Sequence, residues 1–372
     1  GALVFRPLLP VDETRYLSVA WEMWLRNDYM VPHLNGATYS HKPPLLFWLM
    51  NAGWNIFGIT EWWPRLVAPA FGLGCLFLTA RLGKRLWPES QAYLIAPLLL
   101  LGTFYWSVYT TLTMFDLLIC LWTLVGLHGL LDVLDGKPLR GWAFFAVAIG
   151  MGVLSKGPVI LVFLLPAALF APYWSAASVS WLKWYAGTVL ATICGAGIAL
   201  SWALPAGFAG GAEYRNAIFW GQSAGRVVSS FAHGKPFWWY LAILPGLLLP
   251  WLIWPTLWKT VWNKFRNTEI ASSDVAADPK RGVRLTIFWA VVTVAILSAI
   301  SGKRPHYLLP MFPALALLIA FLVATHANGK FVRGRWDVLP ITGITLAFGT
   351  ALLFAPEIAA GAQKAEWVDS SV

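Results

Sequence analysis

Apolar runs of roughly 15–22 residues, about the length that crosses a bilayer as a helix, recur along this chain of 372 residues. Short polar or Gly/Pro segments separate them. Because lipid offers no partners to backbone N–H and C=O groups, only helices and closed barrels can span a membrane. Barrel strands would alternate apolar and polar residues, and these runs do not. The pattern therefore predicts an all-α fold, a polytopic bundle of transmembrane helices.

The composition excludes an ordinary soluble domain. Hydrophobic residues make up 58% of the chain and charged residues 12%, and the mean hydropathy is +0.64. A soluble domain carries about a quarter charged residues. The net charge of +10 does not indicate nucleic acid as a partner, because the basic residues lie in short loops between the apolar runs instead of forming one patch.

The apolar runs give a list of predicted spans and two long loops. Residues 11–61 and 206–236 form the long loops, and 13–27 and 43–58 inside the first loop have the helical apolar spacing of amphipathic helices lying flat on the bilayer. We expect one transmembrane domain over 1–355, with 356–372 starting a truncated or shortened C-terminal part. The spans, of which the first is the last half of a helix, are 1–10, 62–81, 91–106, 114–131, 141–155, 158–173, 184–204, 237–257, 284–300, 308–325 and 337–355.

The distribution of charge across these spans predicts the orientation. The side opposite the long loops carries 15 of the 27 basic residues but only seven of the 17 acidic ones. Loops rich in Lys and Arg stay in the cytoplasm. The two long loops are therefore predicted to face outward.

Four groups of polar residues are predicted on the outward side. They are Asp12, Glu13 and Arg15; His41 and Lys42; Asp116; and a group scattered in sequence, Arg226, His233, Lys235 and Lys303 to Tyr307. Taken singly, each has a structural explanation: Asp12 could cap the helix that follows it, and Lys or Arg at a lipid boundary commonly extends toward water. Taken together on one face, they suit a phosphate-bearing substrate held at the bilayer surface.

The residue types indicate how such a substrate could be handled. Lys42, Arg226 and Lys303 would neutralise phosphate charge, and an acidic residue nearby could deprotonate or orient a nucleophile. If Asp12, His41 and Asp116 converge, a divalent cation such as Zn, Mn or Mg could bind between them. No cofactor follows from the sequence with certainty, and the use of a metal stays open.

Seven motifs in order along nearly the whole chain resemble one superfamily. They are Asp12-Glu13-x-Arg15-Tyr16 with Pro32-His33-Leu34-Asn35-Gly36, Lys42-Pro43-Pro44-Leu45, Phe57-Gly58-x-x-Glu61-x-x-x-Arg65, Asp116 after its Thr-rich stretch, Lys156-Gly157-Pro158, Lys235-Pro236-Phe237-Trp238 with Pro250-Trp251, and Lys303-x-x-His306-Tyr307-x-x-x-Pro310. Their order is similar to that of bacterial GT-C glycosyltransferases of the 4-amino-4-deoxy-L-arabinose (lipid A) transferase and protein O-mannosyltransferase-like superfamily. The position before Lys42 is acidic in the arabinose transferases, whereas this chain has His41.

The resemblance implies a multi-pass enzyme of the bacterial inner membrane with its active site facing the periplasm. Members transfer a sugar from a polyprenyl-phosphate donor, and the acceptor here could be lipid A, other lipopolysaccharide, a glycan or a protein. We expect Asp12, Asp116 and Glu13 to be catalytic. We expect the donor phosphate to be bound by Lys42, Arg226, Lys303, Tyr307 and Arg15.

Two other functions remain open at this point. A transporter or flippase for a lipid-linked or anionic substrate should carry ionisable groups at the bilayer midplane and often repeated halves. The middles of the predicted spans are nearly free of charge, and no repeat is visible. A non-catalytic membrane scaffold would use the polar loop as a docking surface.

Overall fold

The computed structural model describes residues 8, 11–177, 179–221, 234–266, 279–326 and 335–369. Apart from one isolated bridge and a small hairpin, β1 (His33–Leu34) and β2 (Ala37–Thr38), the regular secondary structure of these residues is helical. The all-α prediction is confirmed.

Seven helical segments among the described residues are long and apolar enough to cross a membrane. Each overlaps a span predicted from the sequence, so the chain is a multi-pass membrane protein. The segments are α4 (Trp62–Leu86), α7 (Asp116–Leu134), α8 (Pro138–Lys156), α11 (Trp181–Ala209), α16 (Pro279–Ala299), the 3-10 helix η4 (Pro305–Met311) with α17 (Phe312–His326), and α18 (Arg335–Asp369).

The predicted span 91–106 is not one straight helix. It is divided into α5 (Ala92–Gly102) and α6 (Phe104–Thr110), which are bent by 71°. Thr103 between them is extended, and the indole Nε1 of Trp251 donates a hydrogen bond to its Oγ1 at 3.0 Å. A break inside a membrane helix is tolerated where neighbouring groups satisfy the freed backbone atoms, and the same indole N–H also donates to the carbonyl oxygen of Leu99 at 2.8 Å.

The predicted spans 158–173 and 237–257 are also interrupted. In the second, Pro245, Pro250 and Pro255 recur at intervals of five residues, and each removes a backbone N–H and disfavours a continuing helix. The resulting short helices are α9 (Ile160–Leu169), α10 (Ala171–Ser175), α14 (Trp239–Leu247), the 3-10 helix η3 (Trp251–Ile253) and α15 (Pro255–Arg266).

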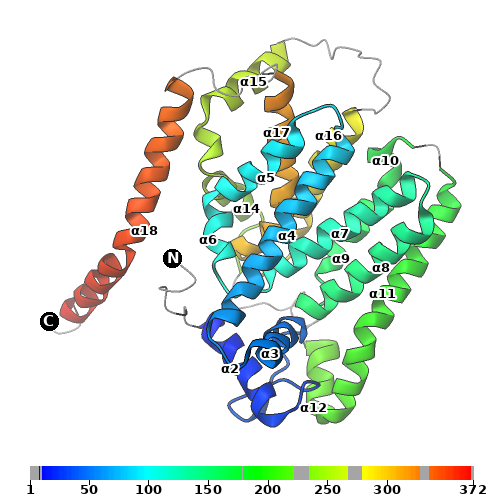
Figure 1. Cartoon of the computed structure of the whole chain (residues 1–372), viewed down its shortest axis with the longest axis vertical. Helices are drawn as coiled ribbons and strands as arrows, with labels where there is room; N and C mark the ends of the chain where they lie inside the picture. The colour runs from blue at the N-terminus through cyan, green and yellow to red at the C-terminus, as the bar shows by residue number, and fades with distance from the viewer. Residues whose placement is uncertain are drawn as a thin grey trace.

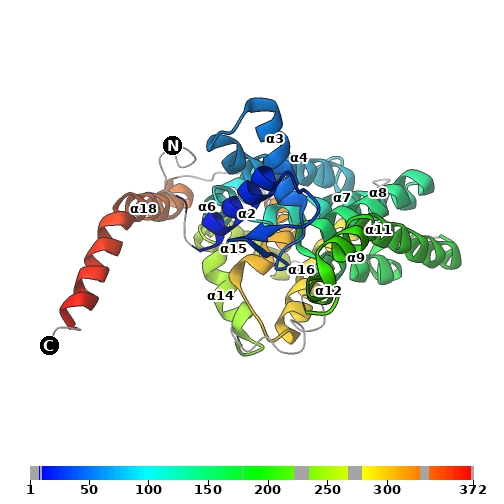
Figure 2. The same ribbon diagram turned by 90° about the horizontal axis from the view of Figure 1, so that it is seen from below.

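Both helices predicted inside the first long loop are present. They are α2 (Asp12–Arg26) and α3 (Leu45–Phe57), and they lie in front of the bundle when it is seen from below (Figure 2). On α2 the buried side chains recur at helical spacing and form one stripe: Glu13, Tyr16, Val19, Ala20 and Met23. The start of the second long loop holds α12 (Gly211–Asn216) and the short π-helix η1 (Ala217–Gly221).

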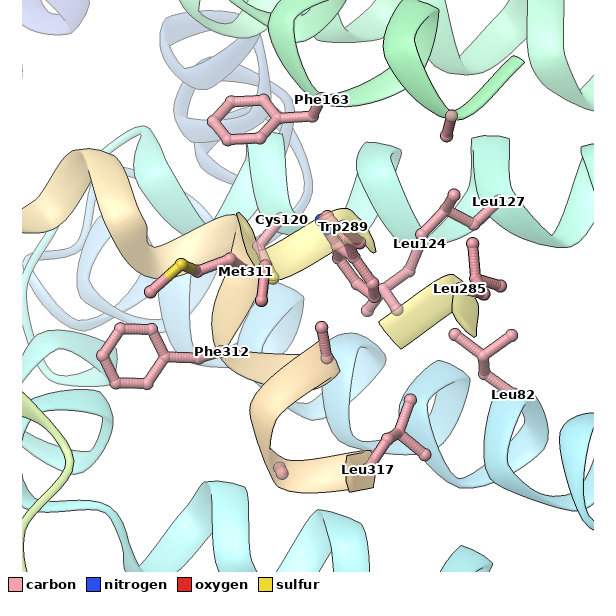
Figure 3. Packing of buried hydrophobic residues seen from close by; sticks show 14 of the residues in the cluster. Leu82, Cys120, Leu124, Leu127, Phe163, Leu285, Trp289, Met311, Phe312 and Leu317 are labelled. Carbon is pink, nitrogen blue, oxygen red and sulfur yellow. The ribbon is translucent and has the colours of Figure 1, made fainter. Parts of the chain in front are cut away.

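The core is formed where spans distant in sequence meet. Leu82 of α4, Leu124 of α7, Trp289 of α16 and Leu317 of α17 pack together with Phe163 of α9 (Figure 3). These side chains are almost completely buried. This packing fixes the relative positions of the helix ends that carry the polar residues.

The two ends of the bundle differ in what they carry. At the end drawn at the bottom of Figure 1 lie α2, α3 and α12, whereas α15 lies at the opposite end and α18 stands apart along one side. At the end opposite α2, Arg85 of α4 pairs with Asp132 at 2.8 Å and Asp135 at 2.6 Å, and Arg140 of α8 pairs with Asp132 at 3.0 Å. These pairs join the ends of α4, α7 and α8, which is a structural role.

Candidate active site

The first residue of α2 lies among cationic and phenolic groups. The carboxylate of Asp12 is 3.6 Å from the guanidinium of Arg15, one helical turn further on, and 3.8 Å from that of Arg304, which precedes η4. About a third of the Asp12 side chain is exposed (33%). This carboxylate can therefore be reached by a substrate while two guanidinium groups flank it.

Tyr16 lies one turn after Asp12 on the same helix. Burial, with the nearby Asp12 charge, raises the pKa of the Tyr16 phenol well above its ordinary value. The phenol is therefore protonated at neutral pH and donates to Oδ1 of Asp12 at 3.4 Å. Its ring packs edge-on against Phe115, with the ring centroids 4.8 Å apart.

A second carboxylate lies in a buried ion pair. Asp116 is the first residue of α7 and Lys156 is the last residue of α8, and the two helices pack side by side as an antiparallel pair. Their side chains meet at 2.5 Å and are only 4% and 11% exposed. The Lys156 ammonium also lies 4.6 Å from the ring centroid of Tyr307. Lys156 therefore joins α7, α8 and η4 at one point.

The two carboxylates share neighbours. Lys42 and His306 interact electrostatically with Asp116, and Tyr109 of α6 interacts with both Asp12 and Asp116. The rings of Tyr109 and His306 are 5.5 Å apart. The fold therefore gathers acidic, basic, imidazole and phenol groups from α2, the loop before α3, α6, α7, α8 and η4 at one end of the bundle.

Glu13, predicted to be catalytic, has a different environment from Asp12. Its side chain is buried, and Oε1 accepts a hydrogen bond from the backbone N–H of Thr113 at 2.7 Å. Successive residues on a helix point about 100° apart, so Asp12 and Glu13 cannot face the same way. In this structure Glu13 faces the loop before α7.

Lys303, predicted to bind phosphate, is also buried. Its ammonium donates to the carbonyl oxygens of Lys235 at 3.0 Å and Ile300 at 2.6 Å. These bonds tie the chain before α14 to the loop before η4. The next residue, Arg304, is the one that reaches Asp12.

The remaining predicted residues are placed as follows. Lys42 lies 5.7 Å from the ring centroid of Phe115, and His41 packs against Tyr39 at 5.4 Å between ring centroids. Tyr307 lies beside Lys156. Arg226 lies outside the described residues, so its role stays a prediction.

The residues offered as metal ligands do not gather in this structure. No group of three His, Cys, Asp or Glu side chains able to hold a metal lies within the described ranges. Asp12 is close to two guanidinium groups, and Asp116 is close to an ammonium. The use of Zn, Mn or Mg stays a prediction, and the proposed reaction does not require a metal.

Sequence reasoning did not assign roles to Lys156, Arg304 and Tyr109. Lys156 begins one of the seven motifs and Arg304 lies inside another, and an ionisable group at the end of a membrane helix is a reason to look for a partner. Tyr109 lies between the predicted spans 91–106 and 114–131 and carries no charge, so nothing in the sequence singled it out.

Several known proteins are similar to this chain over most of its length. A family model described as dolichyl-phosphate-mannose-protein mannosyltransferase matches residues 41–202. An undecaprenyl phosphate-alpha-4-amino-4-deoxy-L-arabinose arabinosyl transferase of Pseudomonas savastanoi pv. phaseolicola is 30% identical, over 94% of this chain and 63% of that protein. A protein of the same name from Pseudomonas aeruginosa strain LESB58 is 29% identical, over 92% of this chain and 61% of that protein.

The fold has matches among solved structures. ArnT from Cupriavidus metallidurans in the apo state gives a TM-score of 0.72, and the same protein bound to undecaprenyl phosphate gives 0.70. Both are 23% identical in sequence, and the match covers 96% of this chain and 62% of theirs. The chain thus spans about three fifths of the length of these relatives. In its fold, its sequence and the order of its motifs, this chain resembles the GT-C superfamily that contains the aminoarabinose transferases and the protein O-mannosyltransferase-like proteins.

Proposed function

We propose that this protein transfers a sugar from a polyprenyl-phosphate donor to a lipid, glycan or protein acceptor at the periplasmic face of the bacterial inner membrane. The observation that carries the proposal is the partly exposed carboxylate of Asp12 between Arg15 and Arg304, at the same site as the buried Asp116–Lys156 pair. The relatives named as undecaprenyl phosphate aminoarabinose transferases support the donor class.

The chemistry is an inverting displacement at the anomeric carbon. An acceptor oxygen attacks that carbon, the bond to the phosphate oxygen breaks, and the polyprenyl phosphate leaves with the bonding electron pair. Asp12 takes the proton of an acceptor hydroxyl, or orients an acceptor phosphate that carries no proton to remove. The departing phosphate gains charge, so cationic groups placed at it stabilise the transition state more than the ground state.

The cationic groups close to the two carboxylates fit that role. Lys42, Arg15 and Arg304 lie at the same end as Asp12, and the guanidinium groups can bind phosphate with two parallel hydrogen bonds. Lys156 is engaged with Asp116, so the pair is suited to fixing the geometry of η4 and α7 around the substrate. Arg226, on the second long loop, is a further candidate.

The positions of the charges favour an enzyme over a transporter. Asp116 begins its helix and Lys156 ends its helix, so this pair lies at the boundary of the spans and not at their middle. A transporter binds its cargo near the bilayer midplane. The basic end opposite α2 supports the periplasmic placement of the site through the positive-inside rule.

The test is transfer of radiolabelled sugar by the purified protein in lipid nanodiscs. The donors would be undecaprenyl phosphate carrying 4-amino-4-deoxy-L-arabinose and, in parallel, other sugars, and the acceptor an extracted bacterial lipid fraction. Asp12→Asn should lower the transfer rate by at least about 100-fold, because Asn cannot accept the proton and no longer has the charge. Glu213→Gln, at an exposed acid on α12, is the matched control and should transfer at the wild-type rate. Unchanged transfer by Asp12→Asn would remove this residue from the mechanism.

A further inference from the structure

Two neighbouring acids at the start of α2 face different surroundings. Asp12 is partly exposed and faces cationic groups, whereas Glu13 is 2% exposed. A buried carboxylate requires strong hydrogen-bond partners, because removing it from water is costly. The hydrogen-bond partners of Glu13 therefore indicate its role.

One partner of Glu13 is a backbone group of the loop that leads into α7. The N–H of Thr113 donates to Oε1 at 2.7 Å, across a separation of 100 residues in sequence. Thr113 is itself completely buried and lies in the non-helical stretch between α6 and α7. Buried backbone N–H groups outside helices and sheets need an acceptor, and here a carboxylate supplies a short, charge-assisted bond.

Thr113 is three residues before Asp116, and that short stretch contacts α2 a second time. Phe115 packs edge-on against Tyr16, whose ring centroid is 4.8 Å away. Glu13 and Tyr16 are three residues apart and so lie on one face of α2. One face of α2 thus holds the loop before Asp116, while Asp12 projects from the same helix into the site.

We propose that Glu13 is a positioning residue, which holds the loop 111–115 through the Thr113 amide and thereby sets where Asp116 lies relative to Asp12. It acts through its acceptor oxygen and takes no part in proton transfer. This inference rests on the proposed function for one of its two readouts, the transfer rate. The other readout, protection of the Thr113 amide, is independent of any activity.

Two substitutions separate the positioning role from a catalytic one. Glu13→Gln keeps an acceptor oxygen at the same place but cannot serve as a base, whereas Glu13→Ala removes the acceptor. We expect Glu13→Gln to retain kcat within about threefold and to keep the pH profile of the wild type. We expect Glu13→Ala to lower kcat by about 10- to 100-fold with a smaller change in KM for the donor, because misplacement of a catalytic group by about 1 Å can cost that much.

Hydrogen–deuterium exchange measures the protection that the Glu13–Thr113 hydrogen bond gives to the loop. Peptides covering 111–115 should stay protected in the wild type and in Glu13→Gln, and should exchange faster in Glu13→Ala. Glu22→Ala is the matched control on the same helix, because Glu22 accepts backbone N–H bonds from Asn35 and Gly36 in the hairpin. That control should alter exchange in the hairpin and leave 111–115 protected.

Each result supports or overturns the proposal. An inactive Glu13→Gln with a protected loop would make Glu13 catalytic, and loss of protection in Glu13→Gln would show that the acceptor oxygen is not what holds the loop. Full activity or full protection in Glu13→Ala would remove the positioning role. If the wild type transfers no sugar, the proposed function fails, while the exchange data still decide whether Glu13 holds the loop.

Discussion

Removal of the Lys156 ammonium should destabilise the protein strongly. Lys156→Met keeps the length and apolar stem of the side chain but leaves the buried Asp116 carboxylate without its 2.5 Å partner. Breaking a buried ion pair from one side costs about 3–5 kcal/mol. Lys42 and His306 remain near Asp116 and offset part of that loss, so we expect about 3 kcal/mol, the lower end of that range.

A double-mutant cycle isolates the pair. Lys156→Met leaves the Asp116 charge unpaired, and Asp116→Asn removes that charge. The double variant should therefore lose less stability than the two single variants added together, with a coupling energy of about 1–3 kcal/mol. The assay is unfolding in mixed micelles of increasing SDS content, followed by tryptophan fluorescence. Lys137→Met changes an exposed lysine at the other end of α8 and should stay within about 0.5 kcal/mol of the wild type. A loss below about 1 kcal/mol for Lys156→Met, or no coupling, would refute the reasoning.

Two further predictions concern the supports around the site. Lys303→Met should lower the free energy of unfolding by about 1–3 kcal/mol in the same assay, because the carbonyl oxygens of Lys235 and Ile300 both lose their donor. Lys235→Met leaves the accepting carbonyl in place and should not lower it, and equal losses in the two variants would contradict the assignment. Gly102→Ala should cost about 1–3 kcal/mol, because a Cβ there would lie 2.6 Å from the Trp251 ring at the bend between α5 and α6. Gly246→Ala, where a Cβ meets nothing within 4 Å, is the control, and wild-type stability in Gly102→Ala would show that the bend can relax.

Much of the fold followed from local patterns. Long apolar runs predicted α4, α7, α8, α11, α16, α17 and α18, and amphipathic spacing predicted α2 and α3. These predictions succeed because each helix satisfies its own backbone hydrogen bonds and needs only a lipid-compatible surface. The bend at Thr103 could not be predicted in this way, since it depends on Trp251, which is remote in sequence.

The same division applies to the site. Asp12 and Asp116 were identified as candidates because acids are unusual in such a chain, and both lie at the predicted end of the bundle. The sequence did not predict their partners: Arg304 reaches Asp12, and Lys156 pairs with Asp116. Lys303, which stays a predicted phosphate-binding residue, donates in this structure to backbone carbonyl oxygens. Neighbouring residues on an irregular loop can point in opposite directions, and no repeating sequence pattern predicts the direction of each side chain.

The sequence by itself determined that this chain is a membrane-embedded helical bundle, and it singled out Asp12 and Asp116 as candidates, because hydropathy and charge are properties of single residues. Only the tertiary structure decided which carboxylate stays open to a substrate, which is paired, and which, like Glu13, holds a loop. Those differences arise from burial and from contacts across 100 residues of sequence, and both exist only once the helices have packed.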